Sequence, residues 1–156
     1  MTRRPTILRH ISILYRHSQI HMNRSLRGLG LGAGPYPFLL AVNRRPGMSQ
    51  DELAEDLAMD RGTTARAVRD LEKAGYLVRS GDPRDRRVQR LSVTESGTGM
   101  VELLDELLRS WMEVLFSGFT DPERAAARDL VERMSENART RLSGESGPSL
   151  RASSRP

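Results

Sequence analysis

Three basic side chains in the segment after Asp60 would share one face of a helix. A helical wheel with about 100° per residue places Arg66, Arg69 and Lys73 within about 60° of one another. The opposite side of the wheel carries residues suited to a core, which are Thr64, Ala67, Val68 and Leu71. A basic face backed by a core-forming face is typical of a helix that binds a polyanion. A merely solvated charged face is the alternative.

A second basic group follows in a short loop. The sequence reads DPRDRR over residues 82–87, after a predicted strand at 76–78 and a predicted turn at 79–83, and before a returning strand at 88–93. The basic residues of this loop are Arg84, Arg86 and Arg87. A hairpin tip of this composition suits the narrow and strongly negative minor groove of DNA. An acid near phosphates is costly, so we interpret Asp85 as holding an arginine guanidinium through a bidentate pair. A loop that is basic only for solubility is the alternative.

Capping residues predict two helices that would position the first basic group. Ser49 and Glu52 have the S-x-x-E spacing of a capping box, and Asp60 is suited to cap the helix that follows. That second helix is predicted to run to about Ala74, with Gly75 as its C-terminal stop. The connection between the two helices is tight, as in helix-turn-helix motifs.

The exposed start of the second helix carries small side chains. Gly62 and Ala65 lie there, and they would allow the helix to sit deep in a major groove, which admits an α-helix. The pattern therefore favours a reader of double-stranded DNA, with the loop as its minor-groove probe.

These motifs resemble the MarR family of winged helix-turn-helix transcriptional regulators. The resemblance covers residues 7–142, and its most specific parts are SQDELAEDL, DRGTTARAVRDLEKAGY, and DPRDRR followed by LSVTESG. It implies a recognition helix over residues 61–74, whose residues nearest DNA are Arg61, Gly62, Thr63, Arg66 and Arg69. It also implies that Arg87 enters the minor groove and is braced by Asp85. Ala65 departs from the family, because many members carry a polar residue there.

The predicted fold is mainly α with a small β-hairpin wing. We expect a single domain over residues 1–143, with a winged-helix region at about 35–97 and a long connecting helix at about 97–118. Helices at about 6–30 and 120–142 flank this region. Thr94 is a predicted N-cap, and Thr120 and Glu123 form a second capping box. The tail at 144–156 is rich in Ser, Gly, Pro and Arg and is predicted to be disordered.

The two flanking helices lie outside the DNA-reading region and carry apolar rows. One row runs from Ile7 to Leu29, and the other lies between Ala127 and Leu142. Operators are usually pseudo-palindromic because their readers are two-fold dimers, and the resemblance implies that these helices interlock to form a homodimer. Packing within one chain is the alternative.

Three histidines share one edge of the first apolar row. They are His10, His17 and His21, and the last two have the i, i+4 spacing that can bind zinc. The first helix offers no Asp, Glu or Cys to complete a site, so we predict no metal and no other cofactor. Ordinary packing is the favoured interpretation, and a pH-sensitive or ligand-lining edge is the alternative.

The resemblance also implies an effector site between the flanking helices and the DNA-reading region. Such a crevice would take a small aromatic or phenolic molecule. The residues that could line it are Tyr15, His21, Tyr36, Phe38 and Arg87.

Composition is consistent with a DNA-binding protein and excludes several other classes. The 156 residues carry a formal charge of +5, with a pI near 10.6, which suits a polyanionic partner. Aromatic residues make up 4% of the chain and cysteine is absent, which argues against stacking on single strands, disulfides and thiolate metal sites. No apolar run approaches the roughly 20 residues that span a bilayer. Arginines and histidines interrupt the segment after the basic N-terminus, so we do not expect a secretory signal there. We therefore expect no membrane partner and a cytoplasmic protein.

Charge is distributed unevenly along the chain. Residues 1–50 hold eight arginines and no acid, whereas residues 101–145 hold six basic and ten acidic residues. The basic N-terminal arm and the acidic C-terminal arm should therefore attract each other, within one chain or between two.

No catalytic pattern competes with this interpretation. The few histidines share one helix, and the glycines at 28–34 lack the GxxxxGK spacing of a phosphate loop. We therefore predict that the protein is not an enzyme. The stronger rival is a protein-interaction module of winged-helix fold without specific DNA binding.

Overall fold

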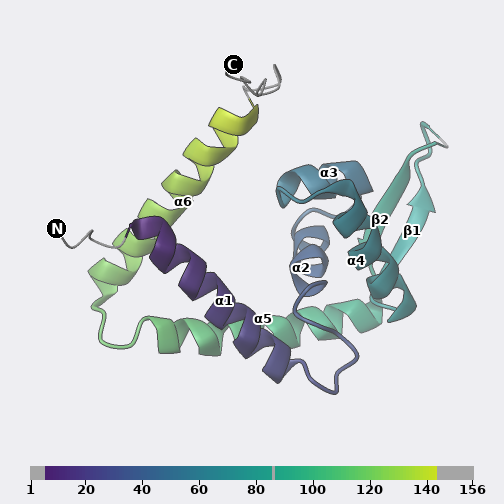
Figure 1. The fold of residues 1–156 in the computed structure, drawn as a ribbon. Coiled ribbons are helices and arrows are strands. Elements are labelled where there is room, and N and C mark those ends of the chain that lie inside the picture. Colours follow the sequence, from purple (N-terminus) through teal and green to yellow (C-terminus); the bar gives the residue numbers. More distant parts are fainter. Residues whose placement is uncertain (1–5, 86, 144–156) are drawn as a thin grey trace, which may run out of the picture. The chain divides into compact units, whose positions relative to one another are not determined.

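Six helices and one antiparallel hairpin make up the part of the chain that the computed structural model describes, residues 6–85 and 87–143. In chain order they are α1 (Ile7–Ser25), α2 (Tyr36–Arg44), α3 (Gln50–Asp56), α4 (Arg61–Lys73), β1 (Leu77–Gly81), β2 (Gln89–Val93), α5 (Glu95–Leu115) and α6 (Asp121–Ser143) (Figure 1). The chain divides into two compact units, one ending at Glu113 and the other beginning at Val114. The predicted mainly α fold with a hairpin wing is confirmed. The predicted tail at 144–156 lies outside the described residues.

The core of the first unit lies among the C-terminal end of α1, α2, α3, α4, the hairpin and the first half of α5. Its largest fully buried side chains are Met22, Leu26, Leu39, Leu53, Leu71, Leu91 and Leu104. One face of each element is apolar, and burying these faces together is what fixes α4 and the hairpin in one body.

The predicted helix-turn-helix caps are confirmed. The Glu52 amide donates to Ser49 Oγ at 3.2 Å and the Ser49 amide donates to Glu52 Oε2 at 2.6 Å, which completes the capping box of α3. Asp60 caps α4 by accepting from the Thr63 amide at 2.8 Å. The turn between the helices includes Ala58 with φ of 51°, a left-handed conformation that non-glycine residues seldom adopt.

The wing is longer than the sequence pattern predicted. Leu77 pairs with Val93 and Gly81 pairs with Gln89, so the predicted turn at 79–83 is wrong for its first three residues, which continue β1. The polar side chain of Arg79 concealed the strand in the sequence. It is held by partners on two helices, described below. A third segment joins the hairpin through an isolated antiparallel bridge between Ser49 and Arg90.

The wing meets α5 at a close junction. Thr94 caps α5, because its Oγ1 accepts from the Gly97 amide at 3.0 Å, as predicted. The same hydroxyl donates to the Gly75 carbonyl at 2.6 Å. The junction thereby ties the end of β2 to the turn after α4.

The first helix ends earlier than predicted, at Ser25 rather than near residue 30. Leu29 therefore lies outside the helix that was expected to carry it. Two glycines after the helix have positive φ, 86° at Gly28 and 71° at Gly30, and this conformation stops a right-handed helix. The Asn23 side chain then holds the following segment by accepting from the Ala33 amide at 3.1 Å.

The second unit contains the end of α5, a short turn and α6. The predicted capping box is confirmed, since the Thr120 amide donates to Glu123 Oε2 at 2.8 Å and the Glu123 amide donates to Thr120 Oγ1 at 3.4 Å. Large apolar side chains of α6 are exposed, among them Leu130, Val131 and Leu142. Within the described residues, no helix is long and apolar enough to cross a membrane.

Candidate nucleic-acid interface

The two faces of α4 are separated as the sequence predicted. Thr64, Ala67, Val68 and Leu71 are buried. Arg61, Arg66 and Arg69 are exposed on the other side. The buried face anchors the helix on the core, and its basic face is free to meet a polyanion.

The first turn of α4 is organised around Asp60. Its carboxylate accepts from the amide of Thr63 at 2.8 Å and from the hydroxyl of Thr63 at 2.6 Å. These hydrogen bonds to Thr63 lower the pKa of Asp60 below its ordinary value. Arg66 Nη2 donates to the same Thr63 hydroxyl at 3.3 Å. The cap therefore fixes Thr63, which in turn gives the Arg66 guanidinium a preferred position.

Gly62 and Arg61 complete this exposed end of the helix. A Cβ at Gly62 would lie 3.2 Å from Asp60 Oδ1, so glycine leaves the cap uncrowded. Arg61 Nε lies 3.3 Å from Asp51 Oδ1 on α3. Both side chains are mostly exposed, and such surface pairs contribute little, so a phosphate could replace the carboxylate. The sequence pattern did not identify Asp51 as a partner.

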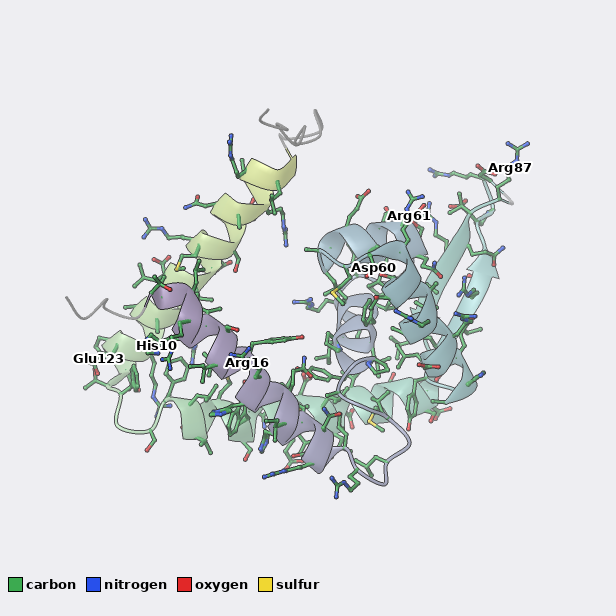
Figure 2. The ribbon with its side chains drawn as sticks, in the orientation of Figure 1. His10, Arg16, Asp60, Arg61, Arg87 and Glu123 are labelled. Carbon is green, nitrogen blue, oxygen red and sulfur yellow. The ribbon has the colours of Figure 1, made fainter. Side chains whose placement is uncertain are left out.

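The wing loop presents exposed arginines beyond the end of the hairpin. Figure 2 shows Arg61 at the start of α4 and Arg87 at the tip of the wing. Arg84, Asp85 and Arg87 are all exposed, whereas Arg86 lies outside the described residues. The exposed face of α4 and the wing loop are therefore two separate basic surfaces of the first unit.

Asp85 holds the backbone of the wing loop. Its Oδ1 accepts from the Arg87 amide at 3.0 Å, and no described ion pair joins this carboxylate to the Arg87 guanidinium. The Asp85–Arg87 side-chain pair that the resemblance implies is not among the interactions of residues 6–85 and 87–143, and Arg86 lies outside the described residues. An aspartate side chain is short, so it readily accepts from the backbone amide two residues further along the chain.

Two arginines that the sequence pattern did not single out attach the wing to the helices. Arg79 of β1 donates from Nε to Glu72 Oε1 at 2.9 Å and from Nη2 to Gln50 Oε1 at 3.1 Å. Arg90 of β2 donates to acceptors in three other segments. The sequence does show one arginine in each strand, Arg79 and Arg90. Their acidic partners on α3 and α4 are revealed only by the structure.

A cavity of about 460 Å³ lies beside α4. Its wall includes three of the predicted effector residues, Tyr15, Tyr36 and Phe38, together with Thr63 and Arg66 of the recognition helix. Burial, and to a smaller extent the neighbouring Tyr15, raise the pKa of Tyr36 above its ordinary value. The cavity therefore brings three of the predicted effector residues together with Arg66, which is exposed on α4.

The other two predicted effector residues lie elsewhere. Arg87 is on the wing loop and does not line this cavity. The His21 ring stacks on Trp111 of α5, with centroids 4.3 Å apart and planes 13° apart. Trp111 Nε1 also donates to Ser18 Oγ at 2.9 Å. The His21 ring therefore packs between α1 and α5, with one face covered by an aromatic side chain from a distant segment.

The remaining histidines show no metal-binding arrangement. His10 and His17 are exposed on α1, and Figure 2 shows His10 near the start of that helix. In residues 6–85 and 87–143, no group of three or more His, Cys, Asp or Glu side chains could hold a metal ion.

A capped two-helix motif, an exposed basic reader face and a basic hairpin define a winged helix-turn-helix DNA-binding protein. A family model described as MarR family matches residues 29–88. The uncharacterized HTH-type transcriptional regulator YybA from Bacillus subtilis (strain 168) is 33% identical over 131 residues, covering 84% of this chain and 87% of that protein. The chain belongs to the MarR family of transcriptional regulators.

Solved structures agree with this assignment. A MarR transcriptional regulator from Methanosarcina mazei Go1 has a TM-score of 0.80 at 38% identity, covering 85% of this chain and 95% of that chain. A MarR family regulator from Listeria monocytogenes, solved in complex with 26mer DNA, has a TM-score of 0.85 at 25% identity, covering 94% and 100% of the two chains.

Proposed function

We propose that this regulator is a homodimer that binds a pseudo-palindromic operator in double-stranded DNA, acts as a repressor, and is released by a small aromatic or phenolic molecule. The observation that carries the proposal is the joint placement of the α4 arginines and the wing loop on one unit. One element suits the major groove and the other suits the minor groove. The similar Listeria monocytogenes regulator, whose structure contains DNA, supports it.

Arg87→Ala tests the DNA-binding half of this proposal. Loss of the wing arginine should weaken binding to a selected duplex by roughly 1–3 kcal/mol, or about five- to 150-fold in Kd. Fluorescence anisotropy of a labelled duplex measures it. The rival function, a protein-interaction module without specific DNA binding, predicts no sequence-dependent duplex binding by the wild-type protein and no effect of the substitution.

Unpartnered apolar surface supports the dimer. On α1, Ile7 and Leu8 are exposed, at 60% and 68%, and on α6 Leu130 and Val131 are exposed, at 53% and 58%. Exposure of such apolar rows to water is unfavourable, and contiguous exposed apolar surface marks an interaction site. A two-fold dimer would cover these rows and place two readers on two half-sites.

Leu130→Asp should convert the dimer into a monomer. A charge placed in a buried apolar interface is unfavourable, and a two-fold interface carries the change twice. Sedimentation velocity measures the mass, and circular dichroism checks that the chain is folded. Thr140→Asp, on the side of α6 away from the apolar row, is the matched control and should remain dimeric. A wild-type monomer, or a folded dimer of Leu130→Asp, contradicts this proposal.

The cavity beside α4 supports control by a ligand. Thr63 and Arg66 line it and also belong to the DNA-facing end of the recognition helix. A ligand that prefers one arrangement of these residues over the DNA-bound arrangement would weaken DNA binding through its differential affinity alone.

Tyr15→Ala should reduce the response to a phenolic ligand and leave DNA affinity without ligand unchanged. Tyr15 is 62% exposed, so its loss opens no core cavity, but it removes an aromatic wall worth about 1 kcal/mol or more. Release of labelled duplex by a series of hydroxybenzoates measures the response. His17→Ala is the control, being an exposed change on the same helix away from the cavity wall. An unchanged hydroxybenzoate response in Tyr15→Ala would exclude this cavity as the effector site.

A further inference from the structure

One guanidinium group attaches the wing loop to the start of α3. Arg90 Nε donates to Asp82 Oδ2 at 2.7 Å, and Arg90 Nη1 donates to Glu52 Oε2 at 3.0 Å and to the Gly47 carbonyl at 3.2 Å. These acceptors belong to the base of the wing loop, the first turn of α3 and the segment before it. Arg90 therefore joins the base of the wing loop to residues 47–52, which are about 40 residues away in sequence.

Each of the two carboxylates holds backbone as well. Asp82 Oδ1 accepts from the Arg84 amide at 2.7 Å, and the Asp82 amide donates to the Val88 carbonyl at 2.9 Å, which closes the loop. On the other side, Glu52 Oε2 accepts from the Ser49 amide at 2.6 Å in the capping box. A continuous series of polar interactions thus runs from the cap of α3 through Arg90 to the backbone that carries Arg84.

Arg90 differs from Arg84 and Arg87 because its guanidinium is paired with carboxylates of the protein. Its side chain is 35% exposed and that of Asp82 is 12% exposed, so this ion pair is shielded from solvent more than a surface pair is. Arg84 and Arg87 are exposed, and within residues 6–85 and 87–143 their guanidinium groups have no side-chain partner. Arg90 is committed to the protein, and Arg84 and Arg87 are available to DNA.

We propose that Arg90 is a positioning residue for DNA binding, which fixes the wing loop relative to the recognition helix so that Arg84 and Arg87 enter the groove together with α4. This inference rests on the proposed function. Arg90 acts through the loop arginines and does not touch DNA itself. It also neutralises Asp82 and Glu52, two acids that would otherwise repel nearby phosphates.

The geometry requires arginine rather than any cation. Two different nitrogens of one planar group reach two carboxylates and a carbonyl, whereas a lysine ammonium is a compact point charge on a flexible stem. Arg90→Lys therefore keeps the charge and removes the bridge. It separates positioning from electrostatic attraction, which Arg90→Ala would not do.

A double-mutant cycle tests the proposal. Duplex affinity is measured for the wild type, Arg90→Lys, the pair Arg84→Ala with Arg87→Ala, and the triple variant. We expect Arg90→Lys to weaken binding roughly fivefold or more in the wild-type background and less than about twofold when the loop arginines are absent, because coupled residues are not additive. Because lysine keeps the positive charge at position 90, loss of that charge does not contribute to the weakening.

A second measurement needs no DNA. Hydrogen exchange of the Arg84 and Arg87 amides should accelerate in Arg90→Lys, while the amides of α4 keep their protection. Arg109→Lys, an exposed change on α5, is the matched control and should alter neither measurement.

Two results would overturn the proposal. Equal effects of Arg90→Lys in both backgrounds would mean that Arg90 does not act through the loop arginines. Unchanged exchange of the loop amides would mean that it does not hold the loop. Absence of duplex binding by the wild type would instead refute the proposed function, while the exchange measurement would still decide whether Arg90 positions the loop.

Discussion

Arg66→Ala is expected to weaken operator binding by about 1–3 kcal/mol in each half-site, and a dimer carries the substitution in both. Arg66 is exposed on the reader face of α4, and its Nη2 is held by the Thr63 hydroxyl at 3.3 Å. A positioned guanidinium in a major groove can bind a guanine edge through two hydrogen bonds. Equilibrium titration of labelled operator duplex, repeated across salt concentrations, measures the weakening.

The pattern of the weakening identifies what Arg66 binds. If it reads a base, discrimination among operators changed at one position should relax. If it binds a phosphate, affinity should fall uniformly across sequences and the salt slope should decrease by about one for each phosphate that is no longer neutralised. Arg109→Ala on α5 is the control and should bind as the wild type does. An unchanged affinity in Arg66→Ala would contradict the assignment of α4 as the reader.

Gly97→Ala is expected to destabilise the fold by at least about 2 kcal/mol, within the range found for overpacked sites. A Cβ there would lie 2.2 Å from the Tyr76 carbonyl oxygen and 2.7 Å from Val93 Cγ1. Neither the backbone after α4 nor the end of β2 can move without disturbing the junction that Thr94 closes. Chemical denaturation measures the free energy of unfolding.

Gly99→Ala provides the matched control for this prediction. Gly99 lies on the same helix, two residues further along, and a Cβ there would meet nothing within 4 Å. Alanine is favoured over glycine inside a helix by about 0.5–1 kcal/mol, so this variant should be unchanged or more stable. Equal unfolding free energies for the two variants would contradict the close approach of α5 to Tyr76.

Local patterns were sufficient to predict the parts of the fold that depend on neighbours in sequence. The capping boxes at Ser49 and Thr120 and the Asp60 cap each join residues three apart, so spacing alone reveals them. The basic and buried faces of α4 follow from helical periodicity in the same way. The helix-turn-helix and its reader face were therefore predictable from the sequence alone.

Interactions between distant segments were not predictable in this way. The Arg90 bridge spans 38 residues to Glu52, and the Trp111 bond to Ser18 spans 93. A wheel drawn for one helix placed His21 at the edge of an apolar row but could not show that Trp111 covers it. Arg79 was assigned to a turn because its strand is polar, and the partners that stabilise it come from other elements.

The most direct test of DNA reading by a dimer is selection of bound duplexes from a random pool by the purified protein, followed by competition and salt titration of the selected sequence. We expect an inverted repeat with half-site centres about 10 base pairs apart, bound far more tightly than random duplex. Recovery of no motif, with binding that is only salt-labile, would contradict a sequence-specific regulator and leave the interaction module as the better description.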